Sequence, residues 1–218
     1  MLTKWSYSSW QAYKQCPFKF KCAYIERLPQ PSSEALERGN LIHAAAEDFL
    51  NGKRATIDPA LMKFESHIKE LKRMRNLKVE QAMAFTSTWE PCAWDDPSVW
   101  LRMKLDVLRP VGTNGAFVGD WKTGKVYNDH AEQLGIYALG CFKGIEVEVV
   151  LAEDWYVDSG LKSKTETFNR NIDERPLQRM WEGRAERMFN DKTLAPTVNK
   201  FCKWCAFSKG KGGPCKHG

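Results

Sequence analysis

Three stretches in the first third of the chain have apolar positions spaced as in amphipathic helices. Residues 6–27 carry aromatic side chains three or four positions apart, which predicts one helix or two short ones, interrupted at Cys16-Pro17. Residues 34–50 place Leu, Ile, Ala and Phe on one face and end at an Asn-Gly pair, so they predict a second helix. An Asp-Pro pair begins residues 58–75, and it predicts a third helix with a cap and a first-turn proline.

The pattern changes at Val79 to short segments rich in Val, Thr, Phe and Trp, which predict β-strands. The predicted strands are residues 79–89, 98–109, 115–122, 145–157 and 164–170. Turn-forming residues separate the second strand from the third, so these two are expected to be neighbours. Further helices are predicted at about 129–142 and 174–190. Helices outside a central mixed sheet make an α/β fold.

Length and composition support one globular unit with extensions. The chain has 218 residues, and 43% of them are hydrophobic, which is enough for a substantial core. It has no run of eighteen apolar residues, and its first residues, MLTKWSYSS, lack the apolar segment of a signal peptide. We therefore expect a cytoplasmic protein.

The net charge of +6 is concentrated at the two ends of the chain. Residues 4–27 carry five basic side chains and one acidic one, and residues 200–218 carry five lysines and no acid. The remainder has 23 basic and 26 acidic side chains, a net charge of about −3. Basic ends attract polyanions such as nucleic acids, although a lysine-rich tail that is merely solvated would show the same pattern.

Asp120 and Lys122 end the predicted strand at 115–122, in the segment GDWKTGK. Strand side chains alternate, so these two point to the same side of the sheet. Asp106 lies in the predicted neighbouring strand, and two carboxylates with a lysine could converge there. Magnesium and manganese prefer oxygen ligands, and a lysine beside them can orient or help to deprotonate the attacking water. The pattern therefore favours metal-assisted hydrolysis.

Each of these signals also has an ordinary structural explanation. An Asp-x-Lys triplet alone is common at strand ends as solvated turn residues. His43 would more often be a core or surface histidine, Glu47 a plain helix-surface acid, and Tyr137 a core residue. Gln133 and Tyr137 are four residues apart and share a helix face. The ordered set of His43, Asp106, Asp120-x-Lys122 and Gln133-x-x-x-Tyr137 is far less expected by chance than any one of these residues.

The chain resembles the PD-(D/E)XK nucleases of the RecB-like branch. The matching residues are His43 in RGNLIHAAAE, Asp106 in MKLDVL, Asp120 and Lys122 in GDWKTGK, and Gln133 and Tyr137 in QLGIYA. The resemblance implies that His43 and both aspartates bind Mg²⁺ or Mn²⁺, that Lys122 assists the water, and that Gln133 and Tyr137 position substrate. Lys104 departs from the family, whose members often have glycine two residues before the first aspartate, and this alters the expected approach of the substrate backbone.

The seven cysteines point to metal or cluster ligation, since no secretory context accompanies them. Cys202 and Cys205 form a CxxC pair, which places two thiolates on one turn. The same nuclease branch includes AddB-type subunits and CRISPR-adaptation exonucleases with one upstream cysteine and three near the C-terminus, which bind a [4Fe–4S] cluster. That resemblance implies Cys16, Cys202, Cys205 and Cys215 as ligands.

Zinc is the alternative occupant, with His217 as a possible fourth ligand. The spacing between Cys205 and Cys215 is longer than the usual family pattern. The other cysteines, Cys22, Cys92 and Cys141, are expected to be ordinary semi-buried thiols.

We expect a single nuclease domain over residues 1–218, in which 31–194 form the core and 1–30 with 195–218 form the iron–sulfur subregion. The resemblance implies a stand-alone exonuclease of a bacterial or phage-infected cell. Its expected substrate is the end of single-stranded DNA, in recombination, repair or replication. Proteins of those processes are its candidate partners. Trp5, Trp10 or Trp204 could stack on bases, although packing around the cluster is the expected place for Trp204. The alternative from another class is a catalytically inactive nucleic-acid-binding or scaffold module on the same fold.

Overall fold

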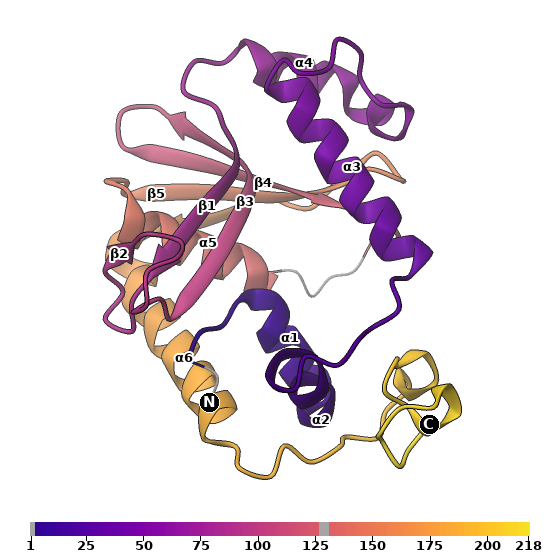
Figure 1. Ribbon diagram of the computed structural model, residues 1–218. Helices are drawn as coiled ribbons and strands as arrows, with labels where there is room; N and C mark the ends of the chain where they lie inside the picture. The colour runs from indigo at the N-terminus through magenta and orange to yellow at the C-terminus, as the bar shows by residue number, and fades with distance from the viewer. Residues whose placement is uncertain (1–2, 127–130) are drawn as a thin grey trace.

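The computed structural model describes residues 3–126 and 131–218, and its architecture is α/β. A mixed sheet lies at the centre, with helices on both of its faces (Figure 1). In the described part of the chain, the strand order is β2-β1-β3-β4-β5-β6, and β7 also pairs with β5. The strands are β1 (Lys78–Phe85), β2 (Pro91–Cys92), β3 (Leu101–Val111), β4 (Gly115–Lys122), β5 (Val149–Tyr156), β6 (Leu161–Lys162) and β7 (Glu166–Asn169). The pair β4 and β5 is parallel and the other pairs are antiparallel, so the predicted mixed sheet is confirmed.

The helices divide between two hydrophobic clusters, one for each face of the sheet. The helical segments are α1 (Tyr7–Gln15), α2 (Pro17–Phe20), η1 (Lys21–Ile25), α3 (Glu34–Leu50), η2 (Pro59–Phe64), α4 (Glu65–Arg73), α5 (Ala131–Gly144), α6 (Arg170–Asn190), η3 (Cys202–Trp204) and η4 (Lys209–Lys211). Helices α1, α5 and α6 contribute to one cluster, and α3, η2 and α4 contribute to the other. The described residues include no helix that is both long and apolar enough to cross a membrane.

The predicted elements differ from the observed ones mainly at their ends. β1 stops at Phe85 because a turn follows it, in which the N–H of Thr86 donates to the carbonyl of Glu90. α6 begins at Arg170, four residues earlier than predicted, because the Asp173 carboxylate accepts the N–H of Asn169. The third predicted helix is a 3₁₀ segment followed by α4. Strands β2 and β6 have two residues each and were not predicted, since so short a strand shows no alternation. Residues 129 and 130 of the helix predicted at 129–142 lie outside the described residues.

The crossover through α5 determines what faces the end of β4. Parallel strands need a long connection, and here it runs from β4 through α5 to β5. The helix therefore packs against the sheet beside the segment GDWKTGK. This placement brings Gln133 and Tyr137 of α5 to the residues at the end of β4.

The C-terminal tail returns to the N-terminal helices. Beyond α6 it runs alongside α1 and α2 and ends in a small irregular lobe (Figure 1). The N–H of Thr197 donates to the sulfur of Cys16 at 3.3 Å, and the Asn199 side chain donates to the carbonyl of Gln15 at 2.9 Å. Two segments about 180 positions apart in the sequence are thus in direct contact.

Candidate active site

Four carboxylates stand on four neighbouring strands at the centre of the sheet. Asp120 of β4 is paired with Asp154 of β5. The register of β3 with β4 sets Asp106 opposite Asp120, next to the pair Val107 and Gly119. The register of β1 with β3 sets Glu80 opposite Asp106, between the pairs on either side. We call Glu80, Asp106, Asp120 and Asp154 the carboxylate row. Strand pairing alone therefore gathers acids that lie up to 74 positions apart in the sequence.

Lys122 occupies one half of this row. Its Nζ lies 2.6 Å from Oδ2 of Asp120 and 3.8 Å from Oδ1 of Asp154. It also donates to Oε1 of Gln133 at 2.6 Å. Gln133 in turn donates to Oδ1 of Asp120 at 3.3 Å and to the hydroxyl of Tyr137 at 2.6 Å. A chain of hydrogen bonds therefore fixes the ammonium group between two strands and α5.

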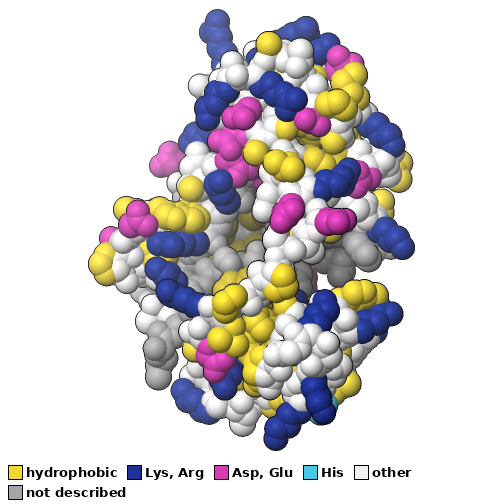
Figure 2. Space-filling model, turned by 45° about the vertical axis from the view of Figure 1, so that its right-hand side comes forward, with side chains coloured by type: hydrophobic (Ala, Val, Ile, Leu, Met, Phe, Trp, Pro, Cys, Tyr) yellow, Lys and Arg dark blue, Asp and Glu magenta, His cyan; other side chains and the backbone are white. Residues whose placement is uncertain are grey.

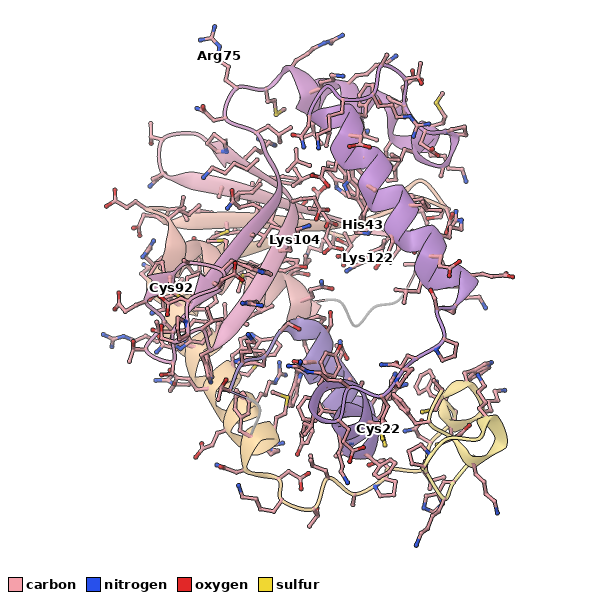
Figure 3. The ribbon with its side chains drawn as sticks, viewed as in Figure 1. Cys22, His43, Arg75, Cys92, Lys104 and Lys122 are labelled. Carbon is pink, nitrogen blue, oxygen red and sulfur yellow. The ribbon has the colours of Figure 1, made fainter. Side chains whose placement is uncertain are left out.

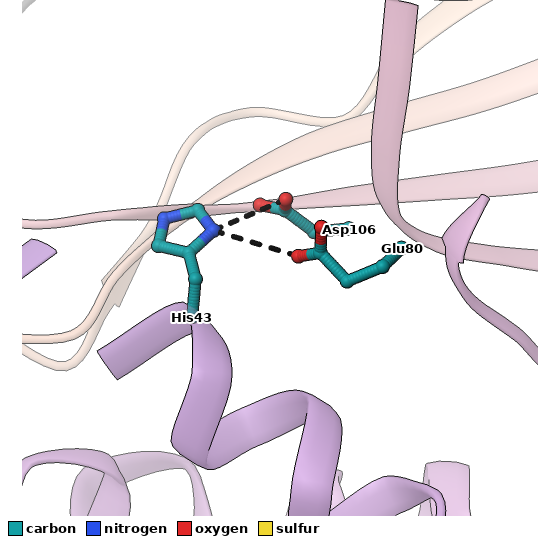
Figure 4. Close-up of side chains that lie close together, drawn as sticks. All are labelled: His43, Glu80 and Asp106. Atoms are coloured by element: carbon teal, nitrogen blue, oxygen red, sulfur yellow. Dashed lines mark hydrogen bonds and ion pairs between the residues drawn. The ribbon is translucent and has the colours of Figure 1, made fainter. Parts of the chain in front are cut away.

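His43 occupies the other half of the row. It projects from α3, and its Nδ1 lies 3.1 Å from Oδ1 of Asp106 and 3.9 Å from Oε1 of Glu80 (Figure 4). The second oxygen of Asp106 accepts the N–H of Trp121 at 2.8 Å. In the described residues, His43, Glu80 and Asp106 form the one group of three such side chains whose ligand atoms all lie within 4.8 Å of one another. The donor set of one imidazole and two carboxylates suits a hard divalent cation.

Burial and the closeness of several carboxylates shift the pKa values of the site residues. Burial and the charge of Asp120 raise the pKa of Asp106 to about 6, and burial raises the pKa of Asp154 to about 6. The proximity of His43, followed by the ion pair with Lys104, lowers the pKa of Glu80 to about 2. Burial alone would lower the pKa of His43, but its contacts with Asp106 and Glu80 raise it to about 10. A bound cation would offset this negative charge, which is the fit that a metal centre requires.

Lys122 is held in its charged form. Burial disfavours the ammonium, but the neighbouring Asp120 and Asp154 overcome this and raise the pKa of Lys122. An ammonium donates hydrogen bonds and does not accept a proton. In this arrangement Lys122 places a positive charge and hydrogen-bond donors between Asp120, Asp154 and Gln133.

The structure brings the six sequence-predicted residues of this site together, in two groups. His43 and Asp106 form one group, and Asp120, Lys122, Gln133 and Tyr137 form the other. Tyr137 is also part of the hydrophobic core, so the structural explanation for it holds alongside the polar one.

Two acids of the row, Glu80 and Asp154, were missed by the sequence analysis. No motif marks them, because each is defined by strand register and not by local spacing. A weak signal existed for Asp154, a charged residue in the apolar strand VVLAEDWY, where burial of an unpaired charge is costly. Its side chain is 1% exposed, and its Oδ1 has no hydrogen-bond partner within the described residues.

A groove of about 460 Å³ gives access to the His43 side of the site. It lies between α3 and the sheet, and its lining includes His43, Glu47, Glu80 and Lys104. Figure 3 shows His43, Lys104 and Lys122 in the space between α3 and the strands. Among the described residues, Glu47 lines this groove without belonging to the group of His43, Glu80 and Asp106.

A second cavity, of about 130 Å³, lies between the tail and the N-terminal helices. We call it the cysteine pocket, because its lining includes Cys16, Cys202, Cys205 and Cys215. Two of the sulfurs accept backbone hydrogen bonds, Cys16 from Thr197 and Cys202 from Asn199, both at 3.3 Å. His217 lines the same pocket.

The aromatic residues that were considered for base stacking have different surroundings. Trp5 and Trp10 are buried in the core. Trp204 is 62% exposed although it borders the cysteine pocket, so the expectation that it packs away around the cluster is wrong. Its ring is covered by Lys203, whose Nζ lies 4.0 Å from the ring centroid, and not by the apolar core.

Comparisons with known proteins find one family model and two solved structures that are similar to the chain. A family model with the description "PD-(D/E)XK nuclease superfamily" matches residues 4–209 of the chain. A solved structure of a candidate exonuclease from Eubacterium rectale has a TM-score of 0.53 and 14% identity, over 93% of this chain and 87% of that one. The structure of a protein named SSO0001 has a TM-score of 0.48 and 16% identity, over 99% of this chain and 87% of that one. No curated protein matches the chain significantly.

Proposed function

The chain belongs to the PD-(D/E)XK nuclease superfamily, and on that premise we propose that it is a DNA nuclease that hydrolyses phosphodiester bonds with Mg²⁺ or Mn²⁺. The observation that carries the proposal is the convergence of Asp106, Asp120 and Lys122 at the centre of the sheet. A binding-only protein has no use for a row of buried carboxylates, which would repel phosphate unless a cation neutralised them.

Each side chain of the site would have a distinct role in hydrolysis. Asp106 and Asp120, with His43, would hold the metal, which supplies Lewis-acid activation of a phosphoryl oxygen and of water. Lys122 donates hydrogen bonds to the attacking water or to the phosphate from a position fixed by Asp120 and Gln133. The hydroxyl of Tyr137 accepts a hydrogen bond from the side-chain amide of Gln133 and so holds Gln133 in place. The water-exposed groove beside His43 admits the substrate.

We assign the cysteine pocket to a [4Fe–4S] cluster held by Cys16, Cys202, Cys205 and Cys215. The four cysteines come from both ends of the chain and line one pocket, as ligands of a single cluster must. Zinc is the alternative occupant, since His217 lines the same pocket. Backbone N–H groups directed at Cys16 and Cys202 are typical partners of such thiolates. This cluster would join residues 1–30 and 195–218 as one subregion beside the core at 31–194, and it supports a place in the RecB-like branch.

Single-stranded DNA is the substrate that the tail favours. Phe201 is 45% exposed and lies beside Trp204, with ring centroids 6.4 Å apart. Lys200 and Lys203 lie over these two rings, and residues 200–218 contain no acid. Figure 2 shows hydrophobic side chains among lysines and arginines on the lower part of the molecule. Exposed rings among cations are what unstacked bases and phosphates bind. In contrast, Lys14 and Lys21 of the N-terminal segment are already paired with Glu132 and Glu26.

We therefore propose a cytoplasmic exonuclease that trims single-stranded ends in recombination, repair or replication. The groove and the tail are the two surfaces that a strand would contact on its way to the carboxylate row.

The test is a cleavage assay with single- and double-stranded DNA labelled at either end, with Mg²⁺ or Mn²⁺, on anaerobically purified protein. Metal-dependent cleavage that is lost in Lys122→Ala and kept in Asp48→Asn, an exposed acid of α3, would support the proposal. Cleavage by Lys122→Ala at the wild-type rate would refute the site. DNA binding without cleavage by the wild-type protein would favour an inactive binding module.

A further inference from the structure

Glu80 is the least expected member of the carboxylate row. It lies inside β1 with φ = 53°, in the left-handed region that non-glycine residues seldom adopt. The register places it opposite Asp106, and like charges on directly opposite residues destabilise a sheet. Local structure and electrostatics both disfavour this residue here, so some interaction must offset the cost.

Two basic side chains lie beside Glu80. Nζ of Lys104 lies 2.7 Å from Oε2, and Nδ1 of His43 lies 3.9 Å from Oε1. The Glu80 side chain is 13% exposed, whereas that of Lys104 is 54% exposed. The carboxylate is thus fixed in the site, while the ammonium sits at the solvent edge of the groove and can swing into water.

We propose that Glu80 is a ligand of the divalent cation held by His43 and Asp106, and that Lys104 competes with this cation for Glu80. The ligand atoms of the three residues lie within 4.8 Å of one another, which is the spacing that one cation needs. Asp120 lies outside that group and is paired with Lys122. The inference rests on the proposed metal-dependent nuclease, and it extends the metal centre by one strand, to β1.

The competition follows from simple electrostatics. A cation between His43, Glu80 and Asp106 would lie next to the ammonium of Lys104, and two positive charges in a partly buried site repel each other. Lys104 must therefore move outward when the cation binds. Moving Lys104 costs its ion pair with Glu80, so the lysine lowers the affinity of the site and makes occupancy depend on cation concentration.

The test is calorimetric titration of the full-length protein with MnCl₂ in the absence of DNA. Glu80→Gln should weaken Mn²⁺ binding about ten- to a hundredfold, because it removes one charged ligand. Lys104→Gln should tighten binding several-fold, because it removes the competitor. Asp48→Asn removes a half-exposed acid of α3 outside the lining of the groove and is the matched control, for which no change is expected.

A merely structural pair would behave differently. If Glu80 served only as the ion-pair partner of Lys104, neither substitution would change Mn²⁺ affinity, and this result would overturn the inference. Glu80→Asp keeps the charge but shortens the side chain, so the carboxylate is drawn back from the cation and Mn²⁺ binding should also weaken. This variant replaces Glu80→Gln in the test if Glu80→Gln does not fold. Wild-type protein that binds no Mn²⁺ would instead contradict the proposed metal-dependent function.

Discussion

The carboxylate row and the cysteine pocket are built in opposite ways. The row lies on four paired strands, and its geometry is determined by sheet register and by the packing of α3 and α5. The pocket lies between a short helix and an irregular tail whose hydrogen bonds are mostly local turns. A site on a sheet is preorganised before any ion binds, whereas a site on loops depends on its ligand for order. Removing the ligands of each should therefore have different consequences.

Asp120→Asn should give the largest change in activity and almost none in stability. Loss of the carboxylate removes a metal ligand and the partner of Lys122, so cleavage should fall by at least about a hundredfold. The unfolding temperature should stay near wild type, because the substitution relieves repulsion from Asp106 and Asp154. Cleavage assays and thermal denaturation measure both. A protein that loses its fold would show that the row is not preorganised.

Cys202→Ser should have the converse effect. Without this thiolate the tail should lose iron and become sensitive to proteases beyond Asn190, while the sheet stays folded. The free energy of ordering the tail should fall by roughly 2–5 kcal/mol, as when a covalent staple is removed from a long loop. Iron analysis and limited proteolysis followed by mass spectrometry give the readouts. Cys92→Ser, a half-exposed cysteine of β2, is the matched control. Unchanged iron content in Cys202→Ser would contradict the ligand assignment.

Trp204→Ala tests whether the tail binds the substrate. Loss of one stacking ring should weaken single-stranded DNA binding by roughly 1–3 kcal/mol, with kcat unchanged at saturating DNA. Trp204→Phe should restore most of the affinity. Trp94→Ala is a suitable control, because this exposed tryptophan has Arg102 over its ring but lies beside β2, away from the tail. Fluorescence anisotropy at several salt concentrations measures the affinity, and equal losses in both alanine variants would exclude a specific platform.

The smallest expected effect concerns the start of the tail. The Asp191 carboxylate accepts the backbone N–H groups of Leu194 and Thr193, and it also accepts from Tyr13 at 3.0 Å. These contacts lower the pKa of Asp191, the Leu194 bond most. A carboxyl with a depressed folded-state pKa adds stability above its unfolded value, near 3.9, and this stability is lost as the pH falls through the folded pKa.

The carboxylate is partly solvated, so its contribution is screened to about 0.5 kcal/mol. Asp191→Asn should therefore lower the free energy of unfolding by about this amount at pH 7 and leave it unchanged at an acidic pH below the folded-state pKa of Asp191. Urea denaturation at both pH values measures the difference. A constant difference across the pH range would show that the hydrogen bonds, and not the charge, matter here.

Much of the fold followed from local patterns. The helix at 34–50 and the strand at 115–122 have the bounds that were predicted, because a capped amphipathic period and an apolar run ended by turn residues are encoded in adjacent positions. Prediction was poorer for β1 and α6, whose ends depend on a turn at Thr86 and on an Asp173 cap. The two-residue strands β2 and β6 are strands only because they pair with β1 and β5.

The sequence by itself determined which side chains are candidates for the two sites. His43, Asp106, Asp120, Lys122 and the four cysteines were proposed from their order along the chain and from the family resemblance, and the structure gathers them in the carboxylate-row site and the cysteine pocket. Only the tertiary structure decided that Glu80 and Asp154 join the carboxylate row, that Lys104 pairs with Glu80, and that Trp204 faces solvent. Strand register and exposure arise from contacts between distant segments, and no local pattern records which residues those contacts bring together.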